Sequence, residues 1–197
     1  RTRDPAGNWS NYYPTFTLYV DTAAPDTTIT SAPSGTVASH SATLQFTSNE
    51  SGVWYQWKMG TSNWVGNGSN TSMTFTGNVP EGTITFQVRA IDSAGNVDPS
   101  PATATWTVDT IAPGTPALTS PDNGSVFNDT TPTLSWSAIP DATLYTLQFD
   151  GNADFNSAGG WTANFNTNSM TFTPIAQGTY YWRIKAIDAA GNESGYS

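Results

Sequence analysis

A five-residue motif, Asp-x-Ala-Gly-Asn, occurs three times in this sequence and combines residue types that could bind a cation. It spans residues 4–8, 92–96 and 188–192. Ca²⁺ takes about six to eight oxygen ligands, and carboxylate and amide oxygens suit it. The same five residues also favour a tight turn, because Asp can accept hydrogen bonds from loop amides and Gly adopts a positive φ easily. The sequence alone leaves both interpretations open.

Residues for enzymatic chemistry are sparse. His40 is the single histidine and lies in a Ser-rich stretch, whereas a catalytic triad needs a base beside its nucleophile. The acidic residues gather at expected turns and linkers, and no phosphate-binding loop or His-rich metal motif is present. We therefore expect a solvated His40 and a segment that is not an enzyme.

Composition restricts the partners further. The 197 residues carry a formal net charge of −9 with six Lys and Arg in total, so nucleic acid and anionic membranes are poor partners. No apolar run approaches the ~20 residues of a membrane span, so we expect no membrane insertion in this segment. The absence of Cys excludes thiol chemistry. Acidity and many Thr, Ser and Asn residues favour an extracellular or cell-surface location.

The motif belongs to a much longer repeat. An offset of 88 residues joins Asp4 to Asp92, and the same offset joins Val20–Asp21–Thr22 to Val108–Asp109–Thr110. An offset of 96 residues joins Asp92 to Asp188. Such periods are too long for a solenoid unit and fit whole domains in tandem.

The segments between the motifs are predicted to be β-strands. Apolar residues alternate with polar ones at Ile84, Phe86, Val88 and Ala90, and again at Tyr180, Trp182, Ile184 and Ala186. Leu44 with Phe46, and Leu134 with Trp136, follow the same rule. Alternation with a period of two buries one face of a strand. About seven short strands in every ~90 residues indicate a β-sandwich.

At this point the chain resembles tandem immunoglobulin-like and fibronectin type III-like repeats of large bacterial secreted or surface proteins of the adhesin or filament type. "VRAIDSAGNVDPSPATATWTVDTIAP" is similar to the last two strands and linker of such a repeat, and "LSWSAIPDATLYTLQF" is similar to fibronectin type III. The resemblance implies an all-β fold of tandem sandwiches. Residues 1–22 would be the C-terminal strands of a preceding Ig-like domain, 23–110 an Ig-like sandwich, and 111–197 a fibronectin type III-like sandwich lacking its last strand, G.

That architecture gathers oxygen ligands where each sandwich meets the linker before it. The candidate calcium ligands are Asp21, Glu50, Asp92 and Asn96 at the first junction, and Asp109, Asp141, Asp188 and Asn192 at the second. Ca²⁺ is the one cofactor that the sequence suggests, and similar adhesin repeats stiffen their junctions with it.

The leading functional hypothesis is a structural or adhesive stalk or filament, whose partners are neighbouring repeats. A second hypothesis is a polymerising fibre subunit joined head-to-tail to identical subunits. Here an orphan N-terminal strand G, with Phe16, Leu18 and Val20 on one face, would complete the last domain of a neighbour by donor-strand complementation. The simpler alternative is that the sequence is a window cut from a longer array.

A third hypothesis is an accessory carbohydrate-binding module of a secreted enzyme, with glycans as partners. Trp54, Trp57, Trp64 and Trp161 fall near two neighbouring expected strands, where a flat exposed ring could stack on a sugar. Core packing is the usual role of Trp in a sandwich. Alternation places Trp57 and Tyr55 on one face and Trp54 on the other, so we expect at least one Trp to face outward.

Overall fold

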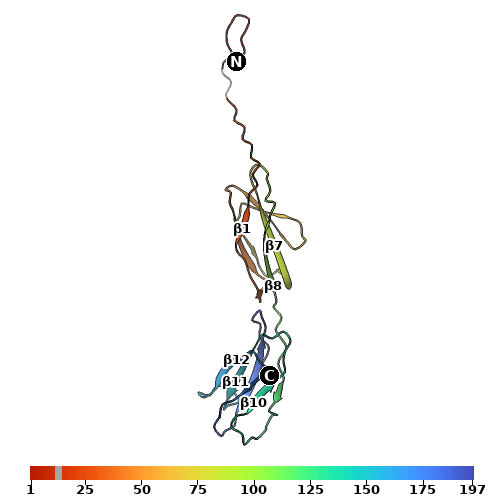
Figure 1. Ribbon diagram of the computed structural model, residues 1–197, viewed down its shortest axis with the longest axis vertical. Helices are drawn as coiled ribbons and strands as arrows, with labels where there is room; N and C mark the ends of the chain where they lie inside the picture. The colour runs from red at the N-terminus through yellow and green to blue at the C-terminus, as the bar shows by residue number, and fades with distance from the viewer. Residues whose placement is uncertain (12–14) are drawn as a thin grey trace.

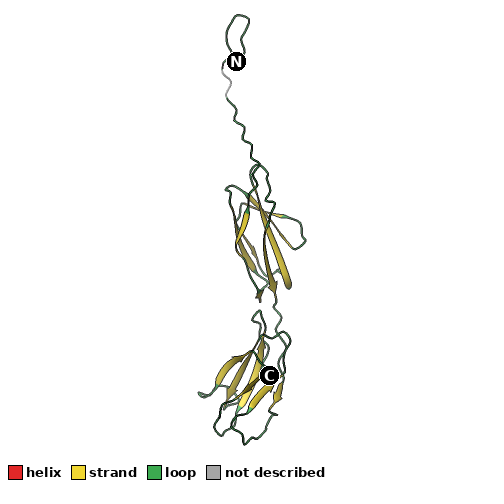
Figure 2. Cartoon of the chain, in the orientation of Figure 1, coloured by secondary structure: helices red, strands yellow, loops and turns green. Residues whose placement is uncertain are grey.

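A computed structural model describes residues 1–11 and 15–197 of the chain. Two β-sandwiches follow one another along the long axis of the molecule, and the N-terminal residues extend beyond the first of them (Figure 1). Within the described residues every regular element is a strand, so the all-β fold is confirmed (Figure 2). No helix that could cross a membrane is present in that part of the chain.

The first sandwich packs a three-stranded sheet on a five-stranded sheet. The smaller sheet has the order β1-β3-β6, and the larger has the order β2-β8-β7-β4-β5. Neighbouring strands are antiparallel except β2 and β8, which pair in parallel. The strands are β1 (Thr27–Ser31), β2 (Thr36–Val37), β3 (Ala42–Ser48), β4 (Trp54–Met59), β5 (Val65–Gly68), β6 (Ser72–Phe75), β7 (Gly82–Ile91) and β8 (Ala102–Val108).

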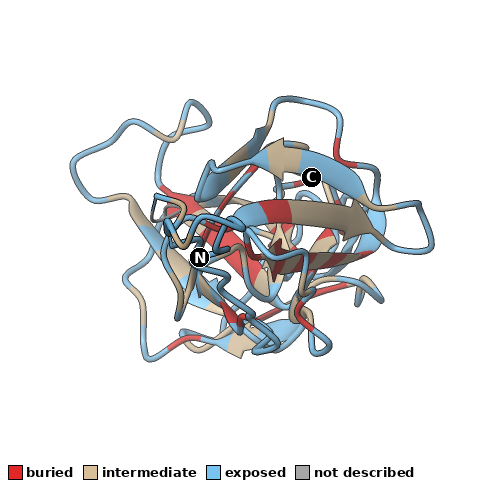
Figure 3. Ribbon diagram, turned by 90° about the horizontal axis from the view of Figure 1, so that it is seen from above, coloured by how far each residue is buried: buried red, intermediate tan, exposed pale blue. Residues whose placement is uncertain are grey.

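The core of the first sandwich follows the predicted alternation. The inward residues of β7 are buried, and so are Leu44 and Phe46 of β3, while Trp106 of β8 fills the space between the sheets. Seen down the long axis, the two sandwiches overlap, with most buried segments near the centre and mainly exposed loops around them (Figure 3). Burial of one face of each strand therefore stabilises this sandwich.

The second sandwich packs two three-stranded sheets, with the orders β13-β10-β9 and β12-β11-β14. Trp136 lies at the centre of its core, in edge contact with Tyr145 and Phe165. The predicted inward residues Leu134, Ile184 and Ala186 are also buried. The strands are β9 (Leu118–Ser120), β10 (Thr133–Trp136), β11 (Leu144–Asp150), β12 (Trp161–Phe165), β13 (Ser169–Thr171) and β14 (Tyr181–Ile187).

The two sandwiches differ at their last strand. Residues 23–110, all described, contain eight strands, whereas residues 111–197, also all described, contain six and none after Ile187. The chain beyond β14 folds back beside it, where the Ser194 N–H donates to the Ala186 carbonyl and the Ser197 N–H donates to the Ile184 carbonyl, both at 2.9 Å. The counterpart of β8 is therefore absent from residues 111–197.

The expected strand near the N-terminus does not form a sheet. Residues 15–22 have no strand assignment, and Tyr12, Tyr13 and Pro14 lie outside the described residues. The side chains of Phe16, Leu18 and Val20 are 91%, 86% and 79% exposed. A strand needs a neighbour to accept and donate its hydrogen bonds, and this segment has none within the described residues, so its role as an orphan strand G stays a prediction.

Candidate functional site

The three Asp-x-Ala-Gly-Asn motifs form one turn with the same geometry, which we call the Asp–Asn turn. In each, the Asn N–H donates to Oδ1 of the Asp, at 2.8 Å for Asn8, 2.8 Å for Asn96 and 2.9 Å for Asn192. The Asn side-chain amide donates to the other carboxylate oxygen at 3.0, 2.7 and 2.8 Å. The Gly φ is 90°, 91° and 90°, which explains why Gly occupies that position.

These hydrogen bonds favour the charged form of each carboxylate. The side-chain amide of Asn96 is the main cause that lowers the pKa of Asp92, and Asn8 lowers the pKa of Asp4 in the same way. Burial opposes the charge of Asp188, but the side-chain and backbone bonds from Asn192 outweigh it and hold the pKa of Asp188 below its ordinary value. The turn is therefore a set of charge-assisted hydrogen bonds.

In both sandwiches the Asn of the Asp–Asn turn also holds the linker that precedes that sandwich. The Asn96 amide donates to the backbone carbonyl of Asp21 at 3.1 Å. The Asn192 amide donates to the carbonyl of Asp109 at 2.9 Å and to that of Ile111 at 3.4 Å. The same side chain thus closes the turn and fixes the incoming chain.

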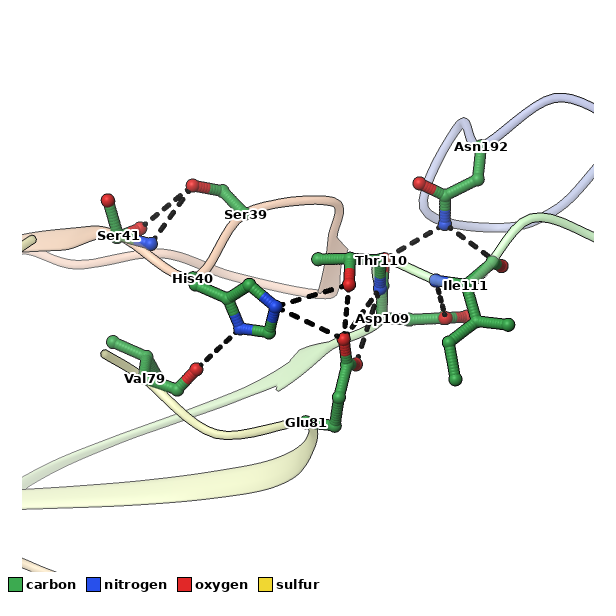
Figure 4. A network of polar contacts seen from close by, with 9 residues as sticks. All are labelled: Ser39, His40, Ser41, Val79, Glu81, Asp109, Thr110, Ile111 and Asn192. Atoms are coloured by element: carbon green, nitrogen blue, oxygen red, sulfur yellow. Dashed lines mark hydrogen bonds and ion pairs between the residues drawn. The ribbon is translucent and has the colours of Figure 1, made fainter. Parts of the chain in front are cut away.

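The linker between the sandwiches is held from its other side as well, by residues of the first sandwich (Figure 4). The Glu81 carboxylate accepts hydrogen bonds from both the backbone N–H and the hydroxyl of Thr110. His40 Nδ1 lies 2.7 Å from the carbonyl of Val79, and His40 Nε2 lies 3.2 Å from the Thr110 hydroxyl and 3.4 Å from Glu81 Oε1. We call residues 109–111 with His40, Glu81 and Asn192 the junction clasp.

His40 is a correction to the sequence analysis. We expected a solvated turn histidine, and the structure shows a half-buried ring bonded on both nitrogens. Nδ1 must donate, because the Val79 carbonyl can only accept. No local sequence signal identifies this role, since the partners of His40 lie about 40 and 70 residues away in the chain.

The predicted calcium ligands come together only in part. Asp92 and Asn96 lie against the backbone of Asp21, as Asp188 and Asn192 lie against the backbone of Asp109. The Asp21 and Asp109 carboxylates instead accept from the N–H groups of Ala23 and Ile111. Among the described residues, Glu50 and Asp141 form no hydrogen bond or ion pair with the Asp–Asn turns, and no group of three Asp, Glu, His or Cys could hold a metal. Calcium binding stays a prediction.

The predicted interface residues match core positions of the first sandwich. By the 88-residue offset, Leu18 and Val20 correspond to Trp106 and Val108 of β8, which are only 2% and 1% exposed. Phe16 corresponds to Ala104, which packs at the edge of that core. The apolar face of this segment thus corresponds to a face of β8 that is buried in the core of the first sandwich.

The four Trp residues considered for glycan binding have different surroundings. Trp57 packs on Phe75 and Phe86 in the first core, and Trp161 stacks on Phe149 in the second. Trp64 lies beside two cationic groups and is half-buried. Trp54 is 67% exposed, as its alternation with the buried Tyr55 predicted.

Each sandwich carries a Gln–Arg hydrogen-bonded pair that the sequence did not reveal. The pair joins β4 to β7 in the first sandwich and β11 to β14 in the second. In the first, Arg89 donates to Oε1 of Gln56 at 2.8 and 3.1 Å. In the second, Arg183 donates to Oε1 of Gln148 at 2.7 Å. Each Gln faces its Arg across a strand pair, so only the register between the strands reveals them.

Comparison with known proteins identifies two enzymes with related segments. The chain is 34% identical over 188 residues to exoglucanase B of Cellulomonas fimi, covering 88% of this chain and 16% of that protein. It is 34% identical over 195 residues to chitinase A1 of Niallia circulans, covering 90% of this chain and 26% of that protein. The chain thus spans about a sixth to a quarter of the length of these relatives. No family model matches the chain.

Among solved structures, a segment of titin supports the fold. The chain is similar to domains A168–A170 of titin with a TM-score of 0.59 at 13% identity, covering 89% of this chain and 64% of that one. The fibronectin(III)-like modules of Clostridium thermocellum CbhA give a TM-score of 0.49 at 17% identity, covering 87% of this chain and 90% of theirs. The chain has an Ig-like or fibronectin type III-like β-sandwich fold. The matched segment is only a small part of each enzyme, as expected for a segment that is not itself an enzyme.

Proposed function

We propose that this chain is a non-catalytic spacer of a secreted polysaccharide-degrading enzyme, which holds the domains on either side of it at a set distance and orientation. The observation that carries the proposal is the junction clasp, in which Asn192 binds the linker from one sandwich and Glu81 binds it from the other. The two relatives, an exoglucanase and a chitinase, support the enzyme class.

Stiffness follows from the linker itself. Pro113 and Pro116 are buried against the second sandwich, and Pro25 is buried at the start of the first. Proline fixes its own φ near −65°, so the chain turns little at these points. Hydrogen bonds on both sides of residues 109–111 remove much of the remaining freedom. The result is a rod rather than a flexible tether.

An extracellular location fits this proposal. A net charge of −9 and Thr-rich outward strand positions keep such a rod soluble and discourage pairing of its sheet edges. Insoluble polysaccharide is met outside the cell, so an enzyme that degrades it must be exported.

A chimera tests the proposal. The matched stretch of the Cellulomonas fimi exoglucanase B is replaced by this chain in one variant and by a Gly/Ser linker of equal residue number in another. We expect the chain to preserve hydrolysis of an insoluble glucan and the flexible linker to reduce it several-fold, with a soluble substrate unaffected by either change. Equal activity of both variants on the insoluble glucan would contradict the spacer function.

A stalk or filament of a surface protein is the second candidate, and the exposed apolar face of Phe16, Leu18 and Val20 favours it. If that face pairs with β14 of a neighbouring copy by displacing residues 194–197, the 197-residue chain will form concentration-dependent oligomers in size-exclusion chromatography, and Leu18→Asp will abolish them. A discrete monomer at all concentrations would rule out this mode of assembly.

A further inference from the structure

We propose that the outer face of β4, β5 and β7 in the first sandwich is a binding site for a neutral polysaccharide chain. Trp54 supplies the stacking surface, and Gln56 and Lys58 supply hydrogen bonds to hydroxyl groups. This proposal rests on the proposed function, because it names the substrate class that the segment would contact. It goes beyond the spacer function, which does not require the segment to bind a ligand.

The stacking surface stands at one end of the outer face. The outward residues of β4 are Trp54, Gln56 and Lys58, since Tyr55 and Trp57 point into the core. Trp54 is 67% exposed although it lies within a regular strand paired with β7 at Ile91. A large aromatic ring is thus held at a fixed place with most of its surface in water, which is the arrangement that a flat sugar ring requires.

The neighbouring edge strand, β5, contains two glycines and therefore has few side chains. Gly68 pairs with Tyr55 and Gly66 pairs with Gln56 across the β4–β5 ladder. A Cβ atom built on either glycine would meet nothing within 4 Å. The position opposite Gln56 on this edge strand therefore carries no side chain, and we call the outer face from Trp54 to Lys58 the strip.

Polar groups line the rest of the strip in fixed orientations. Arg89 donates two hydrogen bonds to Oε1 of Gln56, which turns the Gln56 Nε2 donors away from the guanidinium, and Nε2 has no acceptor among residues 1–11 and 15–197. The Arg89 guanidinium lies 4.1 Å from the centre of the Trp64 ring, and Lys58 Nζ lies 5.1 Å from it. The Trp64 ring thus lies against Arg89 and Lys58 and bounds the strip at its Lys58 end.

The dimensions and charge of the strip indicate the ligand. From Trp54 to Lys58 the strand advances four residues, or about 13 Å, which suits a run of linked sugar rings better than one small molecule. The chain carries a net charge of −9, which disfavours acidic glycans. An aromatic ring followed by amide and ammonium donors matches a neutral sugar, whose rings have apolar faces and hydroxyl edges.

The second sandwich provides an internal contrast, because the outward residue that precedes its paired Gln is small and buried, whereas Trp54 holds that place in the first sandwich. Thr146 of β11 is buried and donates to Asn164 of β12 at 2.9 Å. Each face carries an arginine under an aromatic ring, Arg89 under Trp64 and Arg183 under Phe155 and Tyr196, so the faces differ at Trp54 and Thr146 and not at the arginine. We therefore assign the site to the first sandwich only.

A binding assay with the whole 197-residue chain tests the proposal. The chain is mixed with crystalline cellulose and, separately, with chitin, and the protein left in solution is measured over a range of concentrations. We expect the wild-type chain to bind one or both solids, and Trp54→Ala to weaken binding about tenfold, the loss typical of an aromatic anchor. Gln56→Ala should weaken it by a smaller factor.

Phe127→Ala is the matched control, because Phe127 is also an exposed aromatic residue but lies on a loop of the second sandwich. It should bind as the wild type does, and thermal unfolding should show that all variants are folded. Absence of wild-type binding to both solids, or equal binding by Trp54→Ala, would overturn the proposal. Either outcome leaves the spacer function intact, because the chimera experiment does not depend on binding by this segment.

Discussion

The two sandwiches share their junction chemistry and differ in their sheet faces. Both have an Asp–Asn turn whose Asn binds the preceding linker. The outer face of the first sandwich exposes Trp54 before its paired Gln, whereas the same place before the paired Gln of the second holds the buried Thr146. The Asp–Asn turn is thus repeated because each sandwich must be joined to the chain before it. The outer sheet face is free to differ between the sandwiches.

The largest expected effect tests whether the two cores are independent. Trp106→Ala and Trp136→Ala each remove a fully buried indole, one from each core. Each should lower the free energy of unfolding of its own sandwich by about 3–5 kcal/mol, the range for large-to-small core substitutions. Calorimetry should show one transition shifting while the other stays in place. A simultaneous shift of both transitions would mean that the clasp couples the sandwiches into one cooperative unit.

A smaller effect is expected from the Asn of the turn, which both closes the turn and binds the linker. Asn192→Ala removes hydrogen bonds to Asp109, Ile111 and Asp188, at about 0.5–1.5 kcal/mol each. We expect a lower unfolding temperature of the second sandwich and, by small-angle scattering, a broader range of angles between the sandwiches. Asn8→Ala is the control, because within the described residues Asn8 closes its turn without binding a linker. The same broadening in both variants would contradict the clasp.

The pH dependence of stability compares the same turns. The pKa values of Asp92 and Asp188 are lowered in the folded chain. A depressed carboxyl pKa stabilises the folded state fully above the ordinary value of about 4, and this stabilisation is lost as the pH falls through the lowered value. The unfolding temperature of the wild type should therefore fall more steeply below about pH 4 than that of the Asp92→Asn, Asp188→Asn double variant. Parallel declines would argue against this assignment.

The smallest expected effect concerns calcium. Both oxygens of Asp92 and of Asp188 already accept N–H groups of their own turn. If the motif is only a turn, a chelator and millimolar Ca²⁺ will give the same unfolding temperature for each sandwich. A rise with Ca²⁺ that Asp92→Asn removes from the first sandwich alone would instead support a metal at its junction.

Local pattern predicted much of the fold, and its limits have a physical cause. Alternation placed Phe86, Ile184 and Trp136 in the cores, because a strand with one buried face must alternate. Alternation also placed Trp57 on the inward face of its strand and Trp54 on the outward face. The pairing of Gln56 with Arg89 and of His40 with Thr110 depends on the register and packing of strands far apart in the chain, which no local pattern contains. The strip and the junction clasp became visible for this reason only in three dimensions.

The parallel pairing of β2 with β8 has a mechanical consequence. The chain enters the first sandwich at one end and leaves it at the other, directly after β8 (Figure 1). Tension along the molecule therefore loads the ladder of Thr36 with Thr107 and Val37 with Val108 in shear, so its hydrogen bonds must rupture together instead of peeling apart one at a time. A sandwich built in this way resists being pulled open along the axis of the molecule.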